Sequence, residues 1–122
     1  MTDAFEKDIQ AMYAMAEEGI SLSELMEAVL AVLSRHEEEL RGITHRYRLF
    51  ADDTGYQRAF ALTDGCVSLL TESDSTDVTI IGREKNLLLI FQRKLAPVKA
   101  LLLGRIRVKG DMGALAALAQ FL

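Results

Sequence analysis

The chain has 122 residues, of which half are apolar and about a quarter are charged, with one proline and eight glycines. This composition excludes a disordered, collagen-like or low-complexity chain, and the length suits one domain with one core. The net charge of −4 is unevenly spread, because residues 1–44 carry ten acids and three bases (−7), whereas residues 77–122 carry three acids and eight bases (+5).

The first predicted element is a helix from Ala4 to Glu18, where apolar residues recur at helical spacing. Asp3 is its expected N-cap, and Gly19 is expected to stop it. A second helix follows at once. We therefore expect residues 1–43 to form a helical hairpin that packs on the rest of a single domain.

The second helix begins with a capping box, in which Ser21 precedes Glu24 by three residues. One face is apolar from Leu22 to Leu40, and Gly42 stands where a C′ glycine belongs. His36 lies beside that apolar face. At such a position a hydrogen-bonded histidine at the edge of the core is more frequent than a ligand or an acid–base group.

After the hairpin the apolar period changes from 3.6 to 2, which is typical of strands. Tyr47, Leu49 and Ala51 occupy alternate positions of the first strand. The polar run 52–55 then turns the chain into a second strand, which extends from Tyr56 to Thr63.

Asp64-Gly65 is the strongest turn signal, because a two-residue type I′ turn needs positive φ at both central positions and these residues tolerate it. It leads into a third strand from Cys66 to Thr71. A fourth strand covers Asp77 to Ile81 after a polar loop. We expect these four strands to pair in antiparallel order.

The next segment, residues 83–94, has the composition of a helix with charges at both ends. Pro97 opens another short helix that ends at Gly104. The run 105–109 alternates so regularly that its two apolar side chains are expected to face inward and its three cations to face water. This is the fifth predicted strand.

The last element, residues 112–122, is a helix capped by Asp111, with Gln120 as its only polar side chain. A helix that is apolar almost all round needs a partner or a ligand to cover it. This surplus of apolar surface is the first functional signal in the chain.

The residues show no catalytic or metal-binding pattern. No Gly-x-Ser-x-Gly elbow occurs, and the glycines stand singly at element ends, so neither a hydrolase nor a phosphate loop is indicated. Asp52-Asp53 is interpreted as a turn, and Cys66 as a packed small side chain and not a reactive thiol. With one cysteine and two histidines, an internal disulfide is excluded and zinc is disfavoured. We expect no catalytic residue, no metal and no cofactor.

The sequence also disfavours a nucleic-acid-binding protein and a membrane-spanning or secreted protein. The basic residues lack the glycine and aromatic interleaving of RNA-binding sheets, so nucleic acid is not an expected partner. No apolar run approaches the roughly 20 residues that span a bilayer, and the acidic N-terminus lacks the order of a signal peptide. We therefore expect a cytoplasmic protein.

Three motifs follow one another in the second half of the chain. The first is Phe60-Ala-Leu-Thr-Asp-Gly-Cys-Val, an apolar strand with an Asp-Gly hairpin, and the second is the strand Asp77-Val-Thr-Ile-Ile-Gly. The most specific runs from Lys94 to Asp111: a Lys-Leu-x-Pro helix, a glycine, a basic alternating strand and Gly-Asp. In this order the motifs resemble the sterol carrier protein type 2 (SCP2) family of lipid-binding domains over residues 60–122.

Two features depart from the family's pattern. Gln92-Arg93 stands where the family commonly places a glycine, and the chain ends at Leu122 without the Ser-Lys-Leu type of ending of many eukaryotic members. The resemblance therefore suggests a free-standing, bacterial and cytoplasmic member. It does not extend to the helical hairpin.

The resemblance implies an α+β fold, with a five-stranded, mostly antiparallel sheet covered by helices and preceded here by the helical hairpin. It also implies a non-enzymatic carrier with an apolar tunnel for a fatty acid, acyl-coenzyme A, sterol or isoprenoid-like lipid. Side chains at these spacings are more often plain core, and that alternative stays open for each of them. The predicted lipid-binding residues are Phe60, Leu62, Ile80, Leu87, Leu88, Phe91, Leu101, Leu102, Ile106, Val108, Met112, Leu115 and Leu118.

A second interpretation is a dimerisation or accessory module for an enzyme of lipid or quinone metabolism, with the last helix buried in a partner or in a second copy. The outward cations Arg105, Arg107 and Lys109 suggest transient contact with an anionic membrane surface. For the last helix we expect a lid over the tunnel, because Gly110 offers a hinge and a chain end separates with little steric cost.

Overall fold

The structure, a computed structural model, describes residues 3–121. The order and type of the elements are those predicted from the sequence. In chain order they are α1 (Asp3–Glu17), α2 (Leu22–Arg35), β1 (His45–Ala51), β2 (Gln57–Thr63), β3 (Cys66–Leu70), β4 (Val78–Gly82), α3 (Glu84–Phe91), α4 (Pro97–Leu102), β5 (Ile106–Gly110) and α5 (Met112–Ala119).

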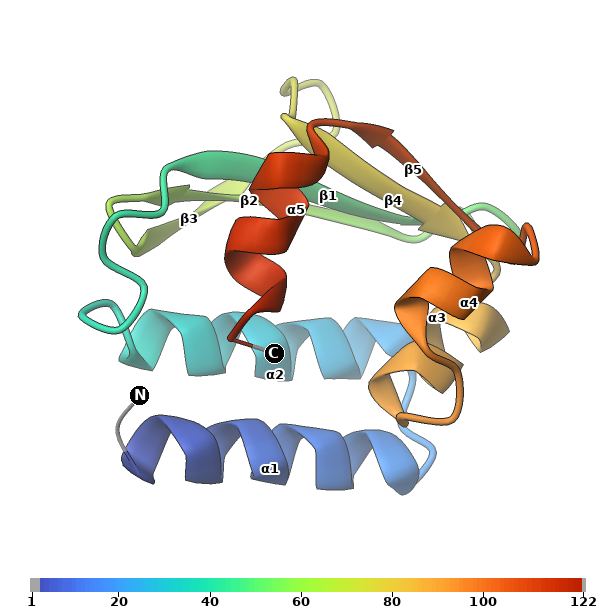
Figure 1. Cartoon of the computed structure of the whole chain (residues 1–122), viewed down its shortest axis with the longest axis horizontal. Coiled ribbons are helices and arrows are strands. Elements are labelled where there is room, and N and C mark those ends of the chain that lie inside the picture. Colours follow the sequence, from blue (N-terminus) through green and yellow to red (C-terminus); the bar gives the residue numbers. More distant parts are fainter. Residues whose placement is uncertain (1–2, 122) are drawn as a thin grey trace.

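The strands form one open sheet in the order β3-β2-β1-β4-β5. β1 and β4 are parallel, and the other neighbours are antiparallel. Figure 1 shows the helices gathered below this sheet, with α2 lying between the sheet and α1. The predicted α+β class with a five-stranded, mostly antiparallel sheet is confirmed.

The direction of β4 differs from the prediction. It runs parallel to β1 and does not continue an antiparallel order, because the loop of residues 71–77 crosses the outer face of the sheet. Two arginines that project outward from β1 hold this loop. Arg46 donates to the Ser75 carbonyl at 3.2 Å. Arg48 donates to the Asp74 carbonyl at 2.5 Å.

α2 begins as predicted and ends earlier. The Ser21 hydroxyl accepts from the amide of the capping-box glutamate, but the helix stops at Arg35, and residues 36–42 form turns. The chain must reverse here to enter β1. Leu40 lies within these turns and is fully buried. Its apolar side chain continued the helical spacing in the sequence and so led to the prediction of a longer helix.

Two helix starts are capped by side chains from distant parts of the chain. The Glu84 amide at the start of α3 donates to Asp53 Oδ1 at 3.0 Å. The Leu22 amide at the start of α2 donates to Glu84 Oε1 at 3.1 Å. These bonds tie the β1–β2 turn to α3 and α3 to α2, so each helix start is satisfied through tertiary structure.

Cys66, which we expected to be a packed side chain, is exposed on the edge strand β3. A hydrogen bond with Glu37, followed by partial burial and the charges of Glu37 and Asp64, raises the pKa of the thiol. Because a raised pKa keeps the thiol protonated, the structure agrees with the expectation that Cys66 is not a reactive nucleophile.

His36 lies at the junction of α1 with the end of α2. Its Nε2 is 2.6 Å from Asp8 Oδ2, and its ring stacks on Phe5 with centroids 4.6 Å apart. The residue is buried, as expected of a hydrogen-bonded histidine at the core's edge. The hydrogen bond from His36 lowers the pKa of the Asp8 carboxyl below its ordinary 3.8, an effect that partial burial opposes and Arg35 supports.

We expect Asp8→Ala to destabilise the protein at neutral pH and to matter much less in acid. Because folding lowers this pKa, the carboxylate's contribution is complete above about pH 4 and is lost as the pH falls through the lowered pKa. Urea unfolding of both proteins at neutral pH and near pH 2.5 measures the effect. An equal loss at both pH values would contradict the assignment.

Candidate functional site

The inner face of the sheet is apolar and faces the helices. Side chains alternate along each strand, so Tyr47 and Leu49 share this face with their pairing partners Phe60, Val78 and Ile80. The sheet and helices together enclose an apolar layer. We define this central layer by the buried side chains of Tyr47, Leu49, Phe60, Leu62, Val78 and Ile106 from the sheet and Leu87, Ala114 and Leu118 from the helices.

The structure brings most of the predicted lipid-binding residues to this layer. Those that are buried within it are Phe60, Leu62, Leu87, Ile106 and Leu118. Those that are partly buried and pack against the same core are Ile80, Leu88, Phe91, Val108 and Leu115. Those that lie exposed, on α4 and at the start of α5, are Leu101, Leu102 and Met112.

The prediction omitted some of the buried residues of the layer. Tyr47 and Leu49 in β1 are both buried there, as is Val78 in β4. The signal was present, because the period of 2 in the first strand marked its odd-numbered side chains as one face. These side chains were nevertheless not among the predicted lipid-binding residues.

α5 is fastened to the sheet by one buried hydrogen bond. The Tyr47 hydroxyl donates to the Ala114 carbonyl at 2.7 Å. Burial, with smaller effects from the charges of Asp77 and Asp111, raises the pKa of Tyr47 to about 12. The phenol therefore remains a donor throughout the physiological pH range.

We expect Tyr47→Phe to loosen α5 selectively. The substitution removes this hydrogen bond, whose net contribution is about 0.5–1.5 kcal/mol. Hydrogen exchange of the α5 amides should accelerate more than that of the amides in β1 and β2. Exchange that rises equally in all elements would show that the bond supports the whole core and not this helix.

A polar corner borders the layer beside α2. Arg58 Nη2 is 2.7 Å from Glu27 Oε1, whereas the buried Nε of Arg58 has no hydrogen-bond partner among residues 3–121. The buried Oη of Tyr56 also lacks one. Burial raises the pKa of the Tyr56 phenol, with opposing effects from Arg58 and Glu27. Both unpaired atoms belong to donor groups, so this corner suits an oxygen acceptor.

A separate cavity of ≈ 260 Å³ lies beside β4 and β5, where β4 leads into α3 and α4 leads into β5. Its lining is mainly polar and includes Asp52, Arg83, Asn86, Arg105 and Arg107. Arg107 Nη2 is 3.6 Å from Asp52 Oδ2 across it. The excess of guanidinium groups makes this cavity suitable for an anion rather than for an acyl chain.

Two further properties bear on function. No helix within the described part of the chain is both long enough and apolar enough to cross a membrane. Residues 3–121 also bring together no group of three histidine, cysteine, aspartate or glutamate side chains with the geometry of a metal site.

The family model of the SCP-2 sterol transfer family matches residues 26–122. The match includes most of α2 and every later element. No curated protein matches the sequence.

Solved structures with the same fold include both free-standing proteins and a part of an enzyme. Palmitated SCP2L2 from Aedes aegypti has a TM-score of 0.62 and 21% identity, over 83% of this chain and 93% of that chain. A double mutant of the sec-alkyl sulfatase PisA1 gives 0.73 and 20%, over 87% of this chain and only 17% of that chain. The UbiJ-SCP2 ubiquinone synthesis protein gives 0.53 and 18%, over 73% and 72%. At these identities the likeness shows a common fold.

Proposed function

Because the chain belongs to the SCP-2 sterol transfer family, we propose that it binds the apolar body of a lipid in the central layer and carries it without chemical change. The observation that supports this proposal is the apolar layer itself. Ten of the residues that were predicted to bind lipid, from both strands and helices, are buried in this core or pack against it. Burying about 14 methylenes is worth roughly 11 kcal/mol, and association costs about 4–15 kcal/mol, so we expect roughly micromolar affinity.

The polar corner supports a choice among lipids. Tyr56 and Arg58 lie two residues apart at the border of the layer, and each keeps a buried donor group unpaired among residues 3–121. A fatty-acid carboxylate has two acceptor oxygens and a charge opposite to that of Arg58. We propose that the carboxylate end of a fatty acid lies at this corner, with Glu27 turning toward solvent when it binds.

Binding of a fluorescent fatty acid to the full chain, with unlabelled palmitate and methyl palmitate as competitors, tests both parts. The wild type should bind at micromolar concentrations and prefer palmitate over its ester. Tyr56→Phe should reduce that preference several-fold without lowering the melting temperature, because it removes no existing hydrogen bond of the ligand-free protein.

Tyr47→Phe is the matched control, since that hydroxyl is already bonded inside the protein. It should lower stability and leave the preference for palmitate over the ester unchanged. If fatty acids, sterols and isoprenoids all fail to bind or to raise the melting temperature, lipid carriage is wrong. If lipids bind but Tyr56→Phe has no effect on the preference, only the assignment of the polar corner fails.

The lid remains part of the proposed function. α5 is the last helix of the described chain, follows Gly110 with its φ of +103°, and is anchored through Tyr47. We expect lipid to slow hydrogen exchange in α5 and deletion of residues 114–122 to weaken binding more than it unfolds the sheet. Exchange in the ligand-free protein as slow as that of the central strands would make α5 an ordinary core helix.

The second candidate function is an accessory module of an enzyme. It is favoured by the similar fold in the sec-alkyl sulfatase PisA1, where the matching part is 17% of the chain. In this case α5 would be covered by a partner. Native mass spectrometry separates the two functions, because a co-purifying lipid supports the carrier and a ligand-free dimer supports the module.

A further inference from the structure

α4 turns its apolar face to solvent. Val98, Leu101 and Leu102 are spaced i, i+3 and i+4 and so share one face of the helix. Val98 is 72% exposed, Leu102 is 83% exposed, and Leu103 directly after the helix is 55% exposed. In α4 only the small side chain of Ala100 is buried. We call the residues Val98, Leu101, Leu102 and Leu103 the apolar tip.

The chain around the apolar tip is basic and contains no acid. From Lys85 to Gly110 the sequence has seven cations and no aspartate or glutamate. Arg93 lies over the Tyr13 ring at 3.9 Å, and Arg107 pairs with Asp52. The seven cations, all of them exposed, are Lys85, Arg93, Lys94, Lys99, Arg105, Arg107 and Lys109.

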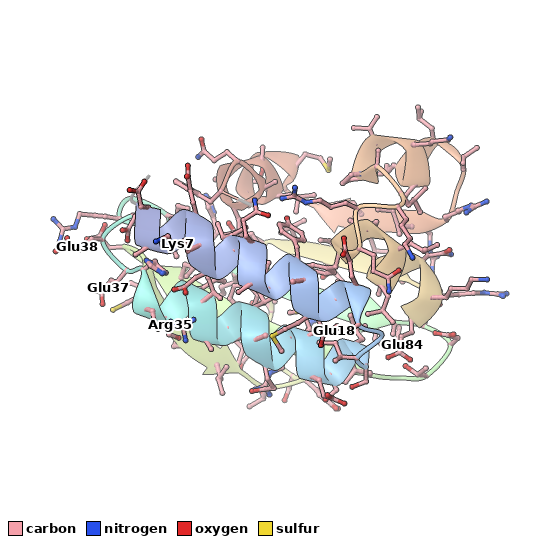
Figure 2. The ribbon with its side chains drawn as sticks, turned by 90° about the horizontal axis from the view of Figure 1, so that it is seen from below. Lys7, Glu18, Arg35, Glu37, Glu38 and Glu84 are labelled. Atoms are coloured by element: carbon pink, nitrogen blue, oxygen red, sulfur yellow. The ribbon has the colours of Figure 1, made fainter. Side chains whose placement is uncertain are left out.

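The arginine-lined cavity adjoins this tip, since Gly104 and Arg105 in its wall directly follow Leu103. The helical hairpin presents the opposite character. Residues 1–44 carry ten acids and three bases. Figure 2 looks onto the hairpin from below and shows Glu18, Glu37 and Glu38 there together with Lys7 and Arg35, while α4 and α5 lie along the opposite edge from α2. The protein therefore has one apolar edge with a basic surround and one acidic face.

We propose that the apolar tip docks the protein on an anionic lipid bilayer. Val98, Leu102 and Leu103 enter the interface between head groups and acyl chains, and the surrounding cations contact lipid phosphates. Charge complementarity selects this occupant, because exposed leucines in a stretch that carries seven cations and no acid from Lys85 to Gly110 fit a surface that is negative outside and apolar beneath.

A second copy of the chain fits the tip less well. A two-fold contact through α4 would bring the cations that flank the tip in both copies, Lys99 and Arg105 among them, toward one another. This inference rests on the proposed function, because a lipid carrier has to load and unload its lipid at membranes. Docking concerns the exterior of the protein and is tested with vesicles. Lipid binding in the central layer is tested in vesicle-free solution, so the two proposals can fail independently.

The chain contains no tryptophan, so Leu102→Trp places a single depth probe on the tip. With vesicles of phosphatidylcholine and phosphatidylglycerol, its emission should shift to the blue and be quenched by brominated lipids. Vesicles of phosphatidylcholine alone and high salt should both reduce the effect. Leu69→Trp is the matched control, because Leu69 is 58% exposed on the edge strand β3 and should show no shift.

Flotation with the same vesicles measures the partition coefficient. The double variant Leu102→Ser and Leu103→Ser should lower it at least tenfold, and Lys99→Glu several-fold. Lys7→Glu on the hairpin makes the same change of charge far from the tip (Figure 2) and should have little effect. The exposed positions allow all variants to keep the wild-type melting temperature.

Equal partition of the wild type and the double serine variant would overturn the proposal, as would an equal response to Lys7→Glu and Lys99→Glu. A blue shift of Leu102→Trp that needs no vesicles and rises with protein concentration would also overturn it in favour of self-association. Inhibition of flotation by millimolar inorganic phosphate alone would indicate a free-anion site in the cavity and count against docking. Fatty-acid binding in vesicle-free solution is unaffected by any of these outcomes.

Discussion

Phe5→Ala should lower the free energy of unfolding by about 3–5 kcal/mol, the usual cost of emptying a fully buried aromatic site. Phe5 is 0% exposed, stacks on His36 and lies 6.0 Å from the Phe121 ring. It therefore joins α1 to the end of α2 and to the C-terminal segment. A domain of this size has about 5–15 kcal/mol in all, so the variant should melt far below the wild type.

Urea unfolding followed by far-ultraviolet circular dichroism and by tyrosine fluorescence tests this and also tests the single domain, in a Tyr13→Phe background that leaves Tyr47 and Tyr56, both outside the helical hairpin, as the fluorophores. Both signals should shift together, because the hairpin and the sheet share one core. Met15→Ala on the same helix is the control, since Met15 is 39% exposed and should cost little. Loss of helical signal with an unshifted fluorescence transition would mean that residues 1–43 fold separately.

Gly65→Ala should destabilise the protein by roughly 3 kcal/mol or more. Gly65 completes the β2–β3 turn at a φ of +86°, where a side chain is strained. A Cβ there would also lie 2.5 Å from the Glu37 carbonyl oxygen and 2.8 Å from the carbonyl carbon of Leu40. The β2–β3 turn would have to move away from the turns that follow α2.

Gly55→Ala isolates the first of these effects, the strain of the backbone conformation. Gly55 has nearly the same φ, +81°, but a Cβ there would meet nothing within 4 Å. Its cost should be about 1–2 kcal/mol, from the backbone conformation alone. Urea unfolding of both variants gives the comparison. If the two substitutions cost the same, the close approach of the hairpin to the turns contributes nothing.

The sequence by itself determined the elements and their local chemistry. The Ser21 capping bond, the positive φ at both Asp64 and Gly65, and the cap that Asp111 gives to α5 are all where the sequence predicted them. Each depends on residues within a few positions of one another. The period of 2 likewise separated the inward and outward side chains of β1 and β5 before any partner strand was known.

Tertiary structure decided what depends on residues far apart. β4 runs parallel to β1 after a loop that crosses the sheet and is bound by Arg46 and Arg48, and no local pattern contains these contacts. α2 stops at Arg35 because the chain has to reverse, although apolar spacing continues beyond it. Only the packed structure shows which groups remain without a partner or a cover. Among residues 3–121 these include the unpaired donors of Tyr56 and Arg58 and the exposed apolar face of α4.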